Sequence, residues 1–177
     1  MASYLRYIQH GLNLAADFIK AMEGDQLDKG VVCRGVRGDF KEAWFKKIQW
    51  VASPLVVEAL AIREGLHFAW GSGYRSIEIE SDSKKLINML RGTIGITMEV
   101  EVLVTVITPL ASYLEVKFQY VKRSIHNEAH CVTYWDQRGA LEGEWVTTPP
   151  CWLNTALLHD FYVGFLFYRL CISSCLY

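Results

Sequence analysis

Two acidic residues, Glu58 and Asp82, have the types and positions to do metal chemistry in this 177-residue chain. Glu58 lies in SPLVVEALAIREGL, whose apolar spacing predicts a helix. Asp82 lies in SIEIESDSKKLINML, where a strand runs directly into the next helix. Mg²⁺ prefers oxygen ligands and is commonly bound by one or two carboxylates together with substrate phosphates. The pair therefore predicts a site where a divalent cation meets phosphate.

The helix that carries Glu58 has a clear start and an apolar stripe. Ser53 is suited to the N-cap and Pro54 to the first helical position. The stripe consists of Leu55, Ala59, Ile62, Leu66 and Ala69. At about 100° per residue, Glu58 falls roughly 60° from Leu55 and Glu64 falls on the opposite face. We therefore expect Glu58 to face the body of the domain, where an unpaired carboxylate would be costly.

Each carboxylate also has a purely structural interpretation. Asp82 could cap the helix that begins at Ser83, because aspartate is a favoured N-cap residue. Glu58 could pair with a buried arginine or lysine. The residues alone leave both alternatives open.

Length and composition indicate one domain with additional segments at its ends. The hydrophobic fraction is 51% and the charged fraction 21%, so a sizeable core can form. Eighteen Lys and Arg residues against 19 Asp and Glu give a net charge of −1. Because the whole chain is not basic, nucleic-acid binding would require a local patch.

A candidate for such a patch consists of four basic residues. Lys84 and Lys85 follow Asp82, and Lys122 and Arg123 stand at the end of a later predicted strand. Contacts of this kind with phosphates give salt-sensitive affinity that does not depend on nucleotide sequence. A solvated charged surface is the alternative for each residue.

The five cysteines and the two termini favour an intracellular protein, in the nucleus or the cytoplasm. An odd cysteine count without CxxC indicates reduced thiols rather than a disulfide framework or a zinc ribbon. The first 22 residues lack the features of a signal peptide. The last 17 residues, FYVGFLFYRLCISSCLY, are apolar but are interrupted by Arg169 and are too short for a membrane span. We expect a docked helix there, or a non-native tail.

The remaining pattern predicts alternating helices and strands, and hence an α/β layer. Strands are expected at 30–36, 40–50, 74–81 and 115–123, and helices at 3–22, 53–70, 84–91, 97–113 and 126–141. Gly92 is a plausible stop for the third of these helices, and Pro109 weakens the fourth.

Three stretches together resemble a known family. GVVCRGVRGDF, SPLVVEALAIREGLHFAWGSGYRSIEIESDSKKLINMLRG and KFQYVKRSIHNEAH are similar to the plant ribonuclease H-like domain of the reverse-transcriptase-like type. This domain occurs alone or in remnants of non-LTR retroelements. The resemblance covers 29–140, which leaves 1–28 as an atypical N-terminal helical segment and 141–177 as a C-terminal extension with an apolar tail. It implies a mixed five-stranded β-sheet flanked by helices.

The resemblance also implies cleavage of the RNA strand of RNA–DNA hybrids with two Mg²⁺ ions, or Mn²⁺. Glu58 matches the family's helix glutamate and Asp82 its strand-end aspartate, while His130 occupies the position on the last helix. Imidazole is a weak ligand for Mg²⁺, so His130 could instead shuttle protons. His130 could also be an ordinary polar residue on a half-buried helix. His126 stands where the family has asparagine.

The chain departs from the family at its start. Members begin with a strand of the type Lys-Ile-Asn-x-Asp-Gly-Ala, whose aspartate bridges the two metals, and no such strand precedes GVVCRGV. Asp25 and Asp28 lie nearby but outside any alternating apolar run. Because that strand is central in the family, we expect the N-terminal helix or the aromatic tail to cover the gap.

Two functional hypotheses follow from this departure. The first is a hybrid ribonuclease weakened by its incomplete metal site. The second is a non-catalytic nucleic-acid-binding or interaction module, or a decayed retroelement fragment. The oligomeric state does not follow from the sequence.

Overall fold

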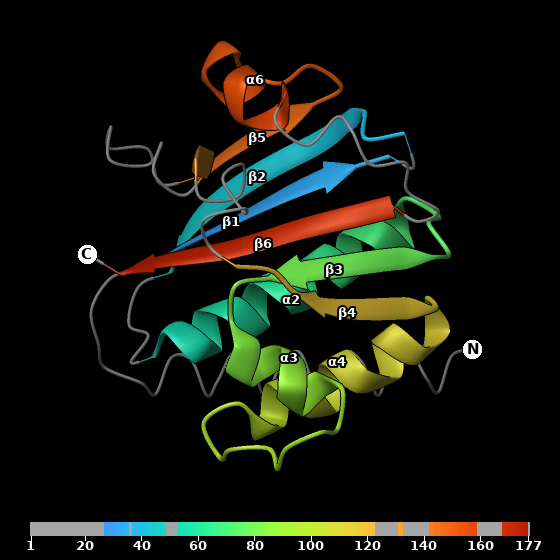
Figure 1. Ribbon diagram of the computed structural model, residues 1–177, viewed down its shortest axis with the longest axis vertical. Helices are drawn as coiled ribbons and strands as arrows, with labels where there is room; N and C mark the ends of the chain where they lie inside the picture. The colour runs from blue at the N-terminus through green and yellow to red at the C-terminus, as the bar shows by residue number, and fades with distance from the viewer. Residues whose placement is uncertain are drawn as a thin grey trace.

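The computed structural model describes residues 27–35, 37–48, 53–122, 131–132, 142–158 and 168–176 (Figure 1). Its strands are β1 Leu27–Arg34, β2 Phe40–Ile48, β3 Ile77–Ser81, β4 Val116–Tyr120, β5 Glu142–Val146 and β6 Tyr168–Leu176. Its helices are α2 Pro54–Gly71, α3 Lys84–Leu90, α4 Glu101–Tyr113 and α6 Cys151–Leu158. The strands form one sheet in the order β4-β3-β6-β1-β2-β5. This mixed sheet flanked by helices confirms the predicted fold class.

The sheet begins with a hairpin formed by the first two predicted strands. β1 and β2 pair antiparallel from Leu27 opposite Ile48 to Arg34 opposite Phe40. The turn is closed by hydrogen bonds from Gly35 N to Asp39 O at 2.8 Å and from Gly38 N to Gly35 O at 2.9 Å. Gly38 has a φ of 78°, a conformation that glycine adopts without steric cost.

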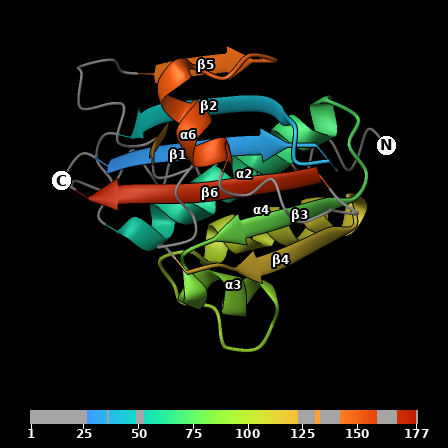
Figure 2. The ribbon, with the colours of Figure 1, turned by 45° about the horizontal axis from the view of Figure 1, so that its top comes forward.

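The middle of the sheet is filled from the far end of the chain. β6 pairs antiparallel with β1, and parallel with β3 from Tyr168 beside Ile77 to Ile172 beside Ser81. Figures 1 and 2 both show β6 between β1 and β3. The expectation of a docked helix at the C-terminus is therefore wrong, whereas the expectation that the aromatic tail covers the gap is confirmed.

The strand conformation of this tail has a physical reason. Ser173 and Ser174 are poor helix formers, because serine competes for backbone hydrogen bonds. Between β1 and β3, a strand satisfies unpaired backbone groups on both of its neighbours. β5, α6 and β6 all come from 141–177, the part that the sequence analysis set apart as an extension.

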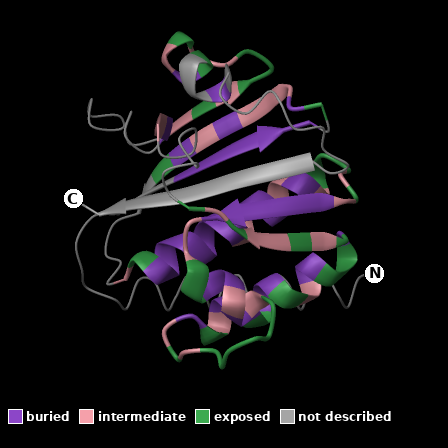
Figure 3. Ribbon diagram, in the orientation of Figure 1, coloured by how far each residue is buried: buried purple, intermediate pink, exposed green. Residues whose placement is uncertain are grey.

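Alternating side chains of the sheet build a separate core on each face. Val31 and Cys33 of β1 and Ile77 and Ile79 of β3 pack with α2 and α4 on one face. The other face carries a smaller cluster, formed by Val32, Ala43, Phe45, Val132, Leu153 and Leu157. Buried residues accordingly run along β1 and β3 and around the first half of α2 (Figure 3). α2 is the central helix, because it contacts β1, β6 and α4.

Most of the remaining predicted elements are present. The helix predicted at 97–113 is present as α4, which begins at Glu101 and contains Pro109. The strand β5 was not predicted from the sequence. Of the helix predicted at 126–141, only Cys131 and Val132 are described, and both are helical. The helix predicted at 3–22 lies outside the described residues. Within the described part of the chain, no helix has the length and apolar character to cross a membrane.

Three of the five cysteines have side chains that the structure describes. Cys33 is buried, Cys131 is half-buried and Cys151 is exposed, and none is in a disulfide. Burial raises the pKa of the Cys33 thiol to about 12, so this thiol stays protonated and unreactive at neutral pH.

Because β6 pairs on both sides, a proline within it should destabilise the whole sheet. Leu170 lies between Cys33 and Ile79. Leu170→Pro removes a backbone N–H from the ladder and leaves its acceptor unpaired, which costs about 1–3 kcal/mol before any effect of the constrained φ. At roughly 2–4 °C per kcal/mol for a domain of this size, thermal unfolding followed by circular dichroism should show a large fall in Tm. Leu170→Val is the control, and equal Tm values for the two variants would contradict the central position of β6.

Candidate functional site

Glu58 is held at the carboxyl end of β3 by a serine. It is 2% exposed on α2, and its Oε2 accepts a hydrogen bond from Ser81 Oγ at 2.7 Å. The same hydroxyl oxygen accepts a hydrogen bond from Ser83 N at 3.0 Å. Ser81 therefore links α2, the end of β3 and the start of α3. The prediction that Glu58 faces the body of the domain is confirmed.

The position of Glu58 follows from how α2 begins. Ser53 occupies the N-cap, where its Oγ accepts a hydrogen bond from Leu55 N at 3.2 Å, and Pro54 begins the helix. Because the helix begins at Pro54, Glu58 lies on the side of α2 that faces the end of β3. Glu64, which lies elsewhere on the helix, forms an ion pair with Arg63 at 3.2 Å. Local capping thus aims one carboxylate at the sheet.

Asp82 directly follows the serine that binds Glu58, so both predicted carboxylates belong to one end of the sheet. The N-cap of α3 is Ser83, whose side chain makes no capping hydrogen bond. The alternative in which Asp82 is the N-cap residue of this helix is therefore not what the structure shows. Val121 N donates to Ser81 O at 3.0 Å, which brings the end of β4 to the same edge.

Two of the four predicted basic residues lie at this edge. The Lys84 ammonium is 6.0 Å from the ring centroid of Tyr120, the last residue of β4, and Lys122 is exposed two residues further along. Lys85 instead forms an ion pair with Glu99 at 3.3 Å in the segment between α3 and α4. Arg123 lies outside the described residues.

Two buried acids on β3 were not singled out by the sequence analysis. Glu78 and Glu80 are 6% and 4% exposed, and Glu78 Oε1 accepts a hydrogen bond from Lys117 Nζ at 2.7 Å. They alternate with Ile77, Ile79 and Ser81, so they occupy the face of the sheet opposite to α2. The alternation of Ile and Glu in IEIES was the sequence signal that could have placed both acids on one face of a strand. These acids do not join Glu58.

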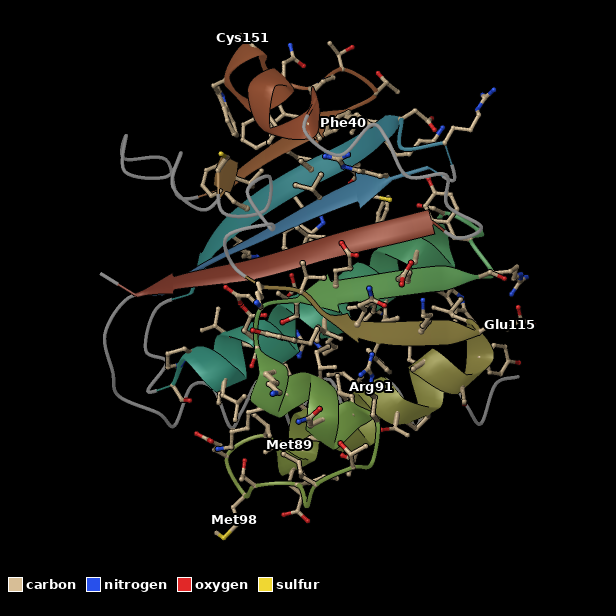
Figure 4. The ribbon with its side chains drawn as sticks, viewed as in Figure 1. Phe40, Met89, Arg91, Met98, Glu115 and Cys151 are labelled. Atoms are coloured by element: carbon tan, nitrogen blue, oxygen red, sulfur yellow. The ribbon has the colours of Figure 1, made fainter. Side chains whose placement is uncertain are left out.

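A surface groove lies at the other end of β4. Its volume is about 520 Å³, and it is lined by residues that include Arg91, Glu115 and Phe118. Arg91 reaches from the end of α3 to β4, where its Nε donates to Phe118 O at 2.9 Å (Figure 4). The groove lies beside the start of β4, whereas Glu58 binds the end of β3, so the groove is not part of the carboxylate site.

The described residues do not fit a pair of divalent cations. They contain no group of three or more His, Cys, Asp or Glu side chains that could hold a metal ion. β6, which occupies the place between β1 and β3, reads YRLCISSCL and contributes no carboxylate. His130, the predicted variant ligand, lies outside the described residues.

Two solved structures align with this chain. RNase H1 from the halophilic archaeon Halobacterium salinarum NRC-1 aligns with a TM-score of 0.50 and 13% identity, over 62% of this chain and 96% of that one. The N-terminal RNase H domain of rv2228c from Mycobacterium tuberculosis, solved as a fusion with maltose binding protein, aligns with a TM-score of 0.47 and 17% identity, over 62% and 96%. The chain therefore has a ribonuclease H-like fold.

A family model extends this identification from fold to family. Residues 22–135, more than half of the chain, match the reverse transcriptase-like family. The chain belongs to that family. No curated protein matches it.

The Ser81–Glu58 hydrogen bond should contribute measurably to stability, because it serves a buried carboxylate. Removing the hydroxyl in Ser81→Ala should lower the free energy of unfolding in urea by about 1–3 kcal/mol. In Glu58→Gln the same Ser81→Ala change should cost less, since hydrogen bonds to charged groups are the stronger ones. Ser81→Thr retains the hydroxyl and is the control. An additive double-mutant cycle would rule out the coupling.

Proposed function

We propose that this chain binds RNA–DNA hybrids at the edge where the carboxyl ends of β3 and β4 meet. The supporting observation is the grouping there of Glu58, fixed by Ser81, with Asp82 beside it and the exposed Lys84 and Lys122. The two ammonium groups can contact phosphates in any nucleotide sequence. Recognition of a hybrid would rest on its shape and its 2′-hydroxyls. Membership of the reverse transcriptase-like family and the ribonuclease H-like fold support this class of ligand.

Hydrolysis is the finer part of the proposal, and we propose that it is weakened or absent. Two-metal cleavage of a phosphodiester requires carboxylates that hold two ions roughly 4 Å apart. Glu58 and Asp82 offer oxygen donors suited to Mg²⁺ or Mn²⁺, but the described residues supply no third ligand. The non-catalytic alternative is therefore favoured by a specific observation, the absence of an acid in β6.

Two predicted residues outside the described part of the chain complete the proposal. Arg123 follows Lys122 directly and would add a third phosphate contact. His130 would shuttle protons in any residual hydrolysis, because its ordinary pKa of about 6.5 lies close to neutral pH. A plant or retroelement origin and a nuclear or cytoplasmic location remain part of the same proposal.

Replacing the two lysines should weaken hybrid binding in a salt-dependent way. We expect Lys84→Ala with Lys122→Ala to lower hybrid affinity and to reduce the slope of log K against log salt by roughly 1 to 2, since each lost phosphate contact removes about 0.7 to 0.9. Fluorescence anisotropy with a labelled hybrid measures both quantities. Lys117→Ala is the matched control, because Lys117 pairs with Glu78 on the opposite face. Equal losses in both proteins would place binding elsewhere.

A cleavage assay tests the weakened metal chemistry. With labelled hybrid and Mg²⁺ or Mn²⁺, turnover should be slow or undetectable, because the described part of the chain offers only Glu58 and Asp82 as carboxylate ligands at this site. Any cleavage that occurs should disappear in Glu58→Gln and in Asp82→Asn. Cleavage that survives both substitutions would exclude this site as its source. Rapid cleavage abolished by either one would overturn the weakened assignment.

A further inference from the structure

The backbone register of β6, the strand between β1 and β3, determines which of its residues is closest in register to Ser81, the partner of Glu58. In the backbone register of β6, Ile172 lies opposite Val31 on one side and beside Ser81 on the other. Val31 belongs to the core under α2, and Ser81 donates its hydrogen bond to Glu58. Residues directly opposite each other on neighbouring strands share a face of the sheet. Position 172 therefore lies in the cross-strand row that ends at the Glu58 carboxylate.

The next position of the strand lies in a different row. Ser173 is registered with Gly30, and successive positions of a strand alternate between the two faces. Positions 172 and 173 are thus adjacent in the chain, but the register assigns them to opposite faces. This pair offers a matched comparison of the same substitution on the two faces.

We propose that residue 172 determines whether Glu58 and Asp82 can hold a divalent cation, and that isoleucine at this position keeps the site incomplete. Isoleucine has no donor atom, whereas a carboxylate at this position would add an acidic group to the row of Ser81, which binds Glu58. This inference deepens the proposed function, since it takes those two residues as ligands. It assigns the missing ligand position to the C-terminal strand.

A third carboxylate would also couple cation binding to folding. Glu58 is 2% exposed, so another buried acid beside it should destabilise the protein unless a cation neutralises the group. A cation that binds only the folded state then raises stability with its concentration. The expected signature is a protein that is weakened without metal and recovers with Mn²⁺.

The test compares Ile172→Asp with Ser173→Asp in the full chain. Mn²⁺ titration calorimetry should give Ile172→Asp a Kd roughly tenfold or more below that of the wild type, because ligand charge count sets affinity at oxygen sites. Its Tm should rise with Mn²⁺, while Ser173→Asp should resemble the wild type in both measurements. No tightening in Ile172→Asp, or equal tightening in Ser173→Asp, would overturn the proposal.

A second pair covers the case in which Ile172→Asp does not fold. Ile172→Cys and Ser173→Cys are milder changes, and a thiolate is a good ligand for a soft cation such as Cd²⁺. Ile172→Cys should gain a sulfur-to-cadmium ultraviolet absorption above the signal that the five native cysteines give in the wild type and in Ser173→Cys. Equal absorption in the two variants would contradict the assigned row.

Hybrid binding by the same samples without metal separates the two proposals. Failure of the wild type to bind hybrid would remove the proposed function and leave the cation result standing. Hybrid binding without a gain in cation affinity would remove only the assignment of residue 172.

Discussion

The rest of the structure depends on the pairing of β6 with β1 and β3. Without this strand the sheet separates into β5-β2-β1 and β3-β4, and no other strand joins them among the described residues. α2 contacts both β1 and β6, so the large core under this helix also depends on the pairing of β6 with β1 and β3. Backbone hydrogen bonds on both sides of one strand thus connect two parts that lie far apart in the sequence.

The same pairing shapes the candidate site. The register that fits β6 beside β3 sets an isoleucine in the row of Ser81 and Glu58. The fold is completed by a segment whose backbone pairs on both sides and whose sequence contains no carboxylate. The fold requires β6 to pair with both of its neighbours, whereas a metal site would require a carboxylate on this strand. β6 fulfils the first requirement and not the second.

Local signals in the sequence predicted much of this arrangement. Ser53 and Pro54 marked the start of α2, and its apolar stripe predicted the inward direction of Glu58. The strand conformation of β6 could not be predicted in this way, because a short apolar run does not distinguish a strand from a helix and its partners are distant. The hydrogen bond of Ser81 to Glu58 joins residues of different elements, so Glu-Ser-Asp-Ser does not reveal which serine makes it.

The place of β6 after all the other described strands in the sequence has a consequence for biosynthesis. The β1–β2 hairpin and the unit from β3 to β4 can each form while the chain is still being made, but both keep an open edge toward the missing strand. β6 emerges from the ribosome after the other described strands, and its pairing with β1 joins residues far apart in the sequence, a topology that folds slowly. The nascent protein therefore carries two unpaired edges, which are sites of intermolecular strand pairing, until β6 is available.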